Sequence, residues 1–247
     1  LFNSGRALQA REMTQLQTII QKELGRVGRH LFKEGASVNP GGVTVNNEYE
    51  FVKLNTNVNQ LPAIPSDLEG VELTSDGAIS FEVIQVVEAS GSDPATLYIR
   101  YTNTSSGSPG ADPVRVAAGS TLTGTRVTDE GNVSYTLTVQ STNTQTNPAV
   151  GQGCQAAIHA GDFFVQGHFV YASEQKKLIS KYSTTPSTSI GFKVLQDIVT
   201  ASDNSALYDN QGATPNLSSP GADRYRVRLV IAERSEVATD ENYFEVA

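Results

Sequence analysis

The sequence lacks most of the residue types from which catalytic and cofactor sites are usually built. It has no tryptophan, one methionine (Met13), one cysteine (Cys154) and three histidines (His30, His159 and His168). A single cysteine excludes a disulfide within the chain, and a cysteine-based zinc site would need ligands from other subunits. The segment around the cysteine offers one basic neighbour, His159. The sequence therefore favours a structural thiol over a nucleophile.

Motifs that carry chemistry are absent as well. There is no Gly-Lys-Ser/Thr phosphate loop, no Gly-x-Ser-x-Gly nucleophile elbow and no His-Glu-x-x-His zinc motif. The histidines are not spaced as a pair of metal ligands. Two carboxylates that cleave a glycosidic bond need no motif, so the sequence leaves that chemistry open. We predict a protein that is not an enzyme and has no catalytic residue, metal site or cofactor.

Long apolar runs are missing, and the charges are unevenly placed. No run approaches the roughly 20 residues of a membrane-spanning helix, and no secretory signal is visible. Residues 6–34 carry six basic and three acidic residues, a net +3, whereas the other 12 basic and 23 acidic residues give −11. We expect no membrane insertion and no nucleic-acid partner, because the chain as a whole is acidic. The basic segment either docks on an acidic partner or forms a solvated helix face.

Small polar residues are abundant instead. Glycine, serine, threonine and asparagine are plentiful, and only 18% of residues are charged. Such a composition favours an all-β protein with many turns. A chain of 247 residues can bury one large or two modest cores. Because it starts without methionine and stops inside the alternating segment Tyr243–Ala247, we expect it to be a piece of a longer polypeptide.

Residues 7–33 carry the period of an amphipathic helix. Six apolar side chains recur at steps of three and four residues and form a stripe about 80° wide. These residues, called the apolar stripe below, are Met13, Leu16, Ile20, Leu24, Val27 and Leu31. The pattern repeats after 11 residues, which keeps a seam between parallel helices straight or slightly right-handed. We predict that the stripe is the interface of a homo-oligomer, most simply a trimeric bundle. The alternative is that it packs on the protein's own β-domain.

Two glycines interrupt this helix. Gly25 and Gly28 each weaken it by up to ~1 kcal/mol. They either permit close approach of another backbone or mark fraying before Gly35 ends the helix. His30 lies on the flank of the stripe, where a packed or solvated histidine is far commoner than a ligand.

After Gly35 the apolar period changes to two. Val43 and Val45, a turn at Asn46–Asn47 and a return strand at Tyr49–Val52 predict a hairpin within residues 36–56. Further strands are predicted at Ile79–Val87, Thr96–Thr102, Val133–Val139, Phe163–Tyr171, Ile190–Val199 and Tyr225–Ile231, and Leu178–Ile179 is expected to begin the partner of the Phe163 strand.

We therefore predict a mainly β protein, in which an N-terminal amphipathic helix precedes antiparallel β-sandwich-type domains. The expected division is a helix for oligomerisation and anchoring in residues 1–35, the hairpin in 36–56, a β-domain in 57–150 and a second β-unit in 151–247. That second unit is expected to continue past Ala247.

The irregular segment 201–223 is too long for an ordinary loop. It contains Asp203, Asp209 and Asp223 close to several asparagines. Oxygen-rich loops can bind calcium, but this spacing fits no EF-hand loop. We therefore predict that these side chains cap turns, and that the segment Asn210–Arg224 is an ordered framework element.

Two stretches of the chain resemble one known family. Residues 210–227 read NQGATPNLSSPGADRYRV, and residues 6–53 combine the helix, a Phe-Lys-x-Gly exit and a Gly-Gly-containing hairpin. Both resemble uncharacterised virion structural proteins of contractile-tailed bacteriophages, described as tail-fibre-like or baseplate-associated. Residues 57–150 match only in general character. The resemblance implies a place in the virion tail, assembly in the host cytoplasm, a part in host attachment, and other tail or baseplate proteins as partners.

Two functions follow as hypotheses. The first is a structural virion protein that forms the N-terminal anchoring or adaptor part of a tail fibre or baseplate appendage. The second is a receptor-binding or saccharide-processing β-module of a tailspike. A saccharide module needs a cleft with converging acids or exposed aromatic residues, and the lack of tryptophan gives it no support.

Overall fold

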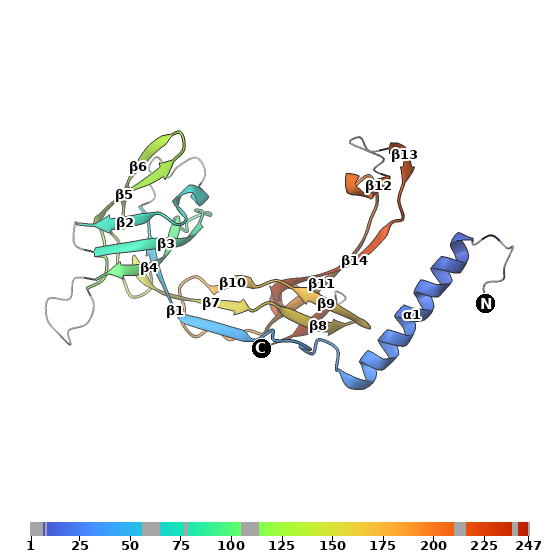
Figure 1. The fold of residues 1–247 in the computed structure, drawn as a ribbon. Coiled ribbons are helices and arrows are strands. Elements are labelled where there is room, and N and C mark those ends of the chain that lie inside the picture. The colour runs from blue at the N-terminus through green and yellow to red at the C-terminus, as the bar shows by residue number, and fades with distance from the viewer. Residues whose placement is uncertain are drawn as a thin grey trace. The chain divides into compact units, whose positions relative to one another are not determined.

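The structure, a computed structural model, describes residues 7, 9–55, 65–76, 79–104, 114–209, 216–238 and 242–246. It is mainly β, with 51% strand and 15% helix. One α-helix, α1 (Ala10–Leu31), precedes antiparallel sheets within this part of the chain (Figure 1). The predicted fold class is confirmed, and the helix begins and ends within the expected residues 7–33.

The chain divides into two compact units, and each unit combines separate stretches of sequence. Unit 1 contains Leu1–Val45, Ala156–Lys177 and Ser187–Ala247, whereas unit 2 contains Asn46–Gln155 and Leu178–Pro186. From the sequence we expected domains that are each one continuous stretch instead. Composition shifts reveal a boundary only where a loop separates two units. Here three of the boundaries fall inside the strands β1 (Val43–Lys53), β7 (Val150–Ile158) and β10 (Gln175–Ser180).

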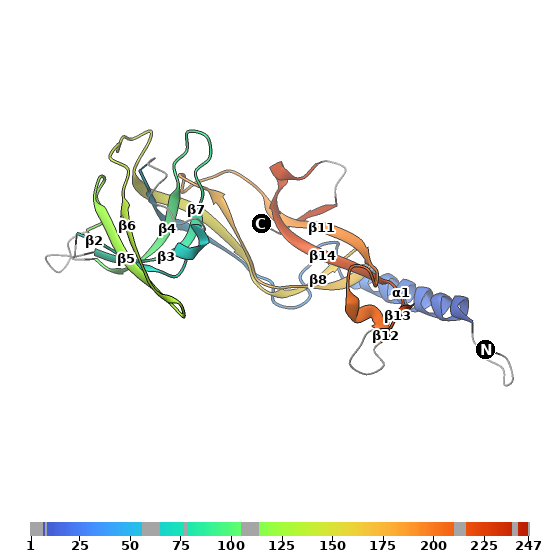
Figure 2. The same ribbon diagram turned by 90° about the horizontal axis from the view of Figure 1, so that it is seen from above.

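The largest sheet has eight strands in the order β10-β7-β1-β4-β3-β2-β5-β6. Its other members are β2 (Glu72–Ser75), β3 (Ile79–Val87), β4 (Thr96–Asn103), β5 (Thr121–Thr128) and β6 (Gly131–Thr138). Strands β5 and β6 form a regular antiparallel hairpin (Figure 2). A 3-10 turn, η2 (Pro65–Leu68), precedes β2.

Three small sheets belong to unit 1. Strands β8 (Gly161–Val165) and β9 (His168–Ala172) form a hairpin. A three-stranded sheet has the order β14-β11-β15, with β11 at Ile190–Val199, β14 at Arg224–Glu233 and β15 at Tyr243–Glu245. Strands β12 (Tyr208–Asp209) and β13 (Asn216–Pro220) form a short pair. The 3-10 turns η3 (Ser205–Leu207) and η4 (Arg234–Glu236) complete the unit.

The hairpin predicted for residues 36–56 is wrong. Residues 43–53 form the single continuous strand β1, whose C-terminal part pairs with β4. Asn46 and Asn47, the expected turn, lie exposed in the extended chain, and the Asn46 side chain accepts a hydrogen bond from the Glu48 backbone (3.0 Å). Asparagine favours turns, but pairing within a wide sheet outweighs that local preference here.

The strand predicted at Phe163–Tyr171 is also wrong, because the chain reverses in its middle. Gln166 and Gly167 have positive φ angles of 52° and 86° and form the turn between β8 and β9. Such angles suit a tight two-residue hairpin turn. Residues Leu178–Ile179 do belong to a strand, β10, but its neighbour in the sheet is β7 and not the Phe163 strand.

Each unit has its own core. In unit 2, buried side chains from most strands of the large sheet form one cluster, which includes Leu73, Phe81, Leu97, Leu122 and Leu137. In unit 1 the core is aromatic. The rings of Phe163, Phe192 and Phe244 lie within 5.0–6.1 Å of one another in tilted or edge-on contacts, which are the preferred geometries of aromatic pairs.

Part of the irregular segment 201–223 is ordered structure. Strands β12 and β13 pair antiparallel within it, and η3 precedes them with the Asn204 side chain as its cap. Residues 210–215 lie outside the described residues. The prediction that Asn210–Arg224 is a framework element is therefore tested only for its second half, where residues 216–220 form β13.

Candidate functional site

Helix α1 has defined ends. The Gln9 backbone N–H donates to the Glu12 carboxylate (2.8 Å), and the Glu12 N–H donates to the Gln9 carbonyl (3.0 Å), which satisfies free groups of the first turn. Glu12 in the first turn and Arg29 in the last turn also suit the helix dipole. At the other end, Phe32 is extended and Gly35 has a φ of 79°. The helix is thus a stable platform for its side chains.

One face of α1 packs on the β8–β9 hairpin through the two glycines. Gly25 and Gly28 are buried. A Cβ on Gly25 would lie 3.3 Å from the Gly167 carbonyl oxygen, and one on Gly28 would overlap the Phe164 ring. The ring of Phe32 continues the contact, with centroids 6.0 Å from Phe164. The glycines therefore permit close approach, which was one of the two alternatives at these positions.

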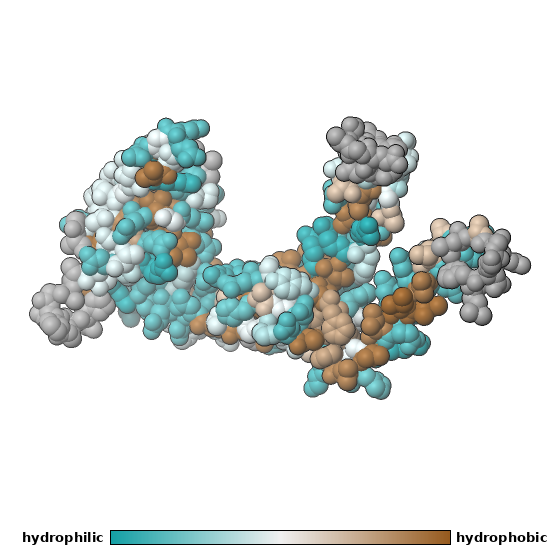
Figure 3. All heavy atoms as spheres, in the orientation of Figure 1, coloured by the Kyte–Doolittle hydropathy of each residue, from teal (hydrophilic) through white to brown (hydrophobic). Residues whose placement is uncertain are grey.

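The apolar stripe lies elsewhere on the helix. At 100° per residue its centre is about 110° round the axis from the glycine face. All six side chains are exposed, by 43% at Leu16 to 70% at Leu31, and the neighbouring Ile19 is exposed as well. Figure 3 shows hydrophobic residues in brown along α1. The described residues of the chain do not bury this stripe, which counts against packing on the protein's own β-domain.

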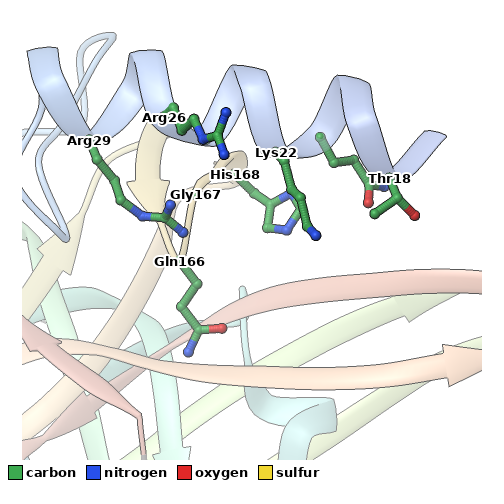
Figure 4. A pocket seen from close by; sticks show the side chains of 9 residues that line it. Thr18, Lys22, Arg26, Arg29, Gln166, Gly167 and His168 are labelled. Atoms are coloured by element: carbon green, nitrogen blue, oxygen red, sulfur yellow. The ribbon is translucent and has the colours of Figure 1, made fainter. Parts of the chain in front are cut away.

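A basic cavity of ≈450 Å³ lies beside the contact between Gly25 and Gly167, which both line it (Figure 4). Lys22, Arg26 and Arg29 reach it from α1, and His168 reaches it from the hairpin; the lining residues include no carboxylate. Arg26 also pairs with Glu23 on the exposed helix surface (2.7 Å). The cavity can hold an anionic group, and it corresponds to the basic segment recognised in the sequence.

The three histidines have different surroundings. His30 is exposed beside the apolar stripe. His168 is half-buried, and the centroid of its ring lies 5.8 Å from that of Tyr225. Among the described residues, no group of three or more His, Cys, Asp and Glu side chains is arranged to hold a metal ion. Cys154 is buried, and its burial raises the pKa of the thiol.

His159 takes part in a contact that the sequence did not reveal. Its Nε2 lies 3.2 Å from the Thr44 hydroxyl, and its Nδ1 lies 3.2 Å from the Glu174 carboxylate. The hydrogen bond from His159, together with Lys176, lowers the pKa of Glu174. No sequence motif predicts this arrangement, because the three residues are far apart in the sequence.

A hydroxyl, an imidazole and a carboxylate in this order are the parts of a nucleophile with its base. All three side chains of this trio are exposed, however, and none of them lines a main cavity of the described residues. A substrate would find no walls and no water-excluded environment there. We interpret the trio as a surface link between β1, the end of β7 and the start of β10.

The capping role predicted for the acidic segment is present at Asp203 and Asn204. The Asp203 carboxylate accepts from the Thr200 N–H (2.9 Å) and hydroxyl (2.7 Å), and these bonds lower its pKa. Asn204 accepts from the Ala206 N–H (3.0 Å). Asp223 lines an open cavity of ≈600 Å³ beside Tyr171. The side chain of Asp209 lies outside the described part.

Searches for related proteins give no further constraint. Neither protein-family models nor curated proteins nor solved structures contain a match for this chain. The resemblance to phage virion proteins therefore stays a prediction. A separate finding is that none of the helices in the described ranges is long and apolar enough to cross a lipid bilayer.

Proposed function

We propose that this chain is a structural component of a phage virion, the N-terminal anchoring or adaptor part of a tail fibre or baseplate appendage, and that it assembles as a homotrimer through the apolar stripe of α1. It has no catalytic activity in this proposal. The observation that carries it is the exposure of six apolar side chains in one line on a well-formed helix. Contiguous apolar surface of this kind marks an interaction site.

The energetics favour a partner for this stripe. Burying the exposed half of a leucine-sized side chain contributes about 1 kcal/mol. Six such residues therefore contribute about 6 kcal/mol per helix, and a bundle sums this over its helices. Association costs on the order of 4–15 kcal/mol in lost freedom. Several helices together can offset that cost, while the glycine face holds each helix on its own β-hairpin.

The place in the virion rests on the sequence resemblance. The helix, the Phe-Lys-x-Gly exit and the segment 210–227 carry it. The partners expected on this basis are further copies of the chain and other tail or baseplate proteins. The fold suits a framework role, because about half of the described chain is strand in hydrogen-bonded sheets.

One observation favours the second candidate function, a receptor- or saccharide-binding module. Phe169, Tyr171 and Tyr225 are exposed and line the ≈600 Å³ cavity that also contains Asp223 and Gln21. Exposed aromatic rings beside polar groups can hold a sugar. Binding of host polysaccharide by the wild-type protein, and its loss in Tyr225→Ala, would favour this function over the adaptor.

The oligomeric state tests the first proposal. We expect the wild-type protein to have three times the chain mass by light scattering coupled to size exclusion. Ile20→Asp introduces a charge into the centre of the stripe and should give monomers. Gln15→Asp adds the same charge about 140° away on the same helix and should leave the trimer intact. A monomeric wild-type protein, or a trimer that survives Ile20→Asp, would contradict the assembly through α1.

A further inference from the structure

An amine is buried in the core of unit 2. Lys53, near the end of β1, is only 3% exposed. Its Nζ donates a hydrogen bond of 2.8 Å to the side-chain oxygen of Asn147. The same Nζ lies 3.8 Å from the ring centroid of Tyr182 and 5.9 Å from that of Phe51. Lysine is rarely buried, and then usually against a carboxylate, whereas here the direct hydrogen-bond partner is a neutral amide.

The surroundings of this amine make its protonated form less favourable. Burial lowers the pKa of Lys53; the carboxylate of Asp93 opposes that effect, and the nearby Lys181 adds to it. A larger share of Lys53 is therefore the neutral, nucleophilic form than in an exposed lysine.

A carboxylate and a phenol complete the cluster. Asp93 accepts hydrogen bonds from Lys181 (2.7 Å) and from the Tyr182 hydroxyl (2.5 Å). Burial acts to raise the pKa of Asp93, but these bonds lower it overall, which favours the ionised carboxylate. Burial, followed by the hydrogen bond to Asp93, raises the pKa of Tyr182 to about 12. Tyr182 is thus neutral and acts as a donor.

The backbone holds the two reacting side chains in one place. The Lys53 N–H donates to the Ala149 carbonyl (2.8 Å), and the Lys53 carbonyl accepts from the Gln140 N–H (2.8 Å). These bonds fix Lys53 to both ends of the segment that carries Asn147. When folding already holds two reactants close together, their reaction loses much less entropy than it would between free molecules.

We propose that Lys53 and Asn147 join in an intramolecular amide bond, formed by the folded protein itself. The Nζ electron pair attacks the side-chain carbonyl carbon of Asn147, and the bond from that carbon to the amide nitrogen breaks. Two protons of the Lys53 ammonium pass to the leaving nitrogen, with Asp93 as the relay, so that ammonium departs. Atoms and charge balance, and no oxidant, metal or cofactor is needed.

The exposure pattern suits this reaction. Lys53 is buried, which keeps water from competing with the amine, while the segment around Asn147 is exposed and gives the ammonium a way out. The bond would tie β1 to the segment that follows β6, across 94 residues of sequence. Such a cross-link constrains the unfolded chain in the way a disulfide does, in a protein that has no cysteine pair. The proposal is independent of the oligomeric state.

Intact-protein mass spectrometry tests the proposal directly. We expect the wild-type protein to weigh about 17 Da less than its sequence, which is the mass of one ammonia. Digestion should yield one branched peptide that contains Lys53 and Asn147, and the denatured chain should run faster on a gel. Asn147→Ala should restore the full sequence mass and the slower migration, as should Lys53→Arg if that variant folds. Gln145→Ala, an exposed change in the same segment, should keep the cross-link.

Asp93→Asn tests the relay, since it retains both reacting residues and should leave the chain at its full mass or cross-link it more slowly. A wild-type protein that keeps its full sequence mass after several days at neutral pH would overturn the proposal. A mass loss that persists in Asn147→Ala would do the same.

Discussion

The large sheet and helix α1 differ in which kinds of residue they bury and which they expose. In the sheet, three buried polar residues have partners: Lys53 bonds Asn147, Ser75 bonds Ser120 (3.1 Å), and Thr96 bonds the Pro94 carbonyl (3.1 Å). In α1, two glycines are buried and the apolar stripe is exposed. Buried polar groups are costly unless paired, and exposed apolar lines are costly unless covered. These three groups of the sheet are satisfied within one chain, whereas we propose that the stripe of the helix is covered by a partner.

The largest effect that distinguishes the two regions should come from the sheet core. Phe81→Ala removes a fully buried ring of β3 and should lower the free energy of unfolding by about 3–5 kcal/mol. Leu24→Ala in the exposed stripe should change the unfolding free energy of the separated chain by less than about 0.5 kcal/mol. Chemical denaturation of both variants in an Ile20→Asp background makes the comparison. Equal losses would mean that the stripe is buried within the chain.

A smaller effect should come from the glycine face of α1. Gly28→Ala places a methyl group against the buried ring of Phe164. The overlap should cost about 1–3 kcal/mol, more than the gain of up to ~1 kcal/mol in helix propensity. Gly42→Ala is the matched control, because nothing lies within 4 Å of its added Cβ. Thermal unfolding should show a lower Tm for Gly28→Ala alone. A rise in Tm for Gly28→Ala would show that α1 does not pack on the hairpin through this face.

Some elements of both regions could be predicted from the sequence and others could not, depending on whether local or distant residues determine them. Strands Ile79–Val87 and Ile190–Val199 were predicted with their observed bounds, because dense apolar residues between turn signals are a local property. The helix period was equally local. The continuous strand β1 was missed, because its pairing with β4 depends on residues about 45 positions away. For the β8–β9 turn, the sequence alone did not show that Gln166 has a positive φ.

The chemistry outside the helix was hidden for a related reason. Lys53 with Asn147, and Thr44 with His159 and Glu174, become neighbours only through the order of strands and the loops between them. Neither cluster has a sequence motif, since motifs report only residues that are close along the chain. The stripe could be predicted as a surface, but which side of α1 packs on the body depends on the fit of Gly25 and Gly28 to the hairpin.

The smallest expected effect is a pH dependence at the surface trio. The hydrogen bond from His159, the larger cause, and the interaction with Lys176 lower the pKa of Glu174 below its ordinary value of 4.5. A carboxylate with a depressed pKa in the folded state stabilises that state above its unfolded pKa, and this contribution is lost as the pH falls through the folded value. Wild type should therefore be slightly more stable than Glu174→Gln at pH 7, and the difference should shrink at an acid pH at which the carboxylate is protonated.

The effect should be small, because all the groups of the trio are exposed and solvent screens such pairs. Urea unfolding of both proteins at the two pH values measures it, and about 0.5 M salt should reduce the difference at pH 7. Glu48→Gln is the matched control, since Glu48 is also exposed but is not among the groups that shift the pKa of Glu174. The difference in stability between Glu48→Gln and wild type should not change with pH in the same way. A Glu174→Gln difference that grows toward low pH would contradict the expected sign. It would mean that the carboxyl group is bound in its protonated form, so that His159 is not its partner.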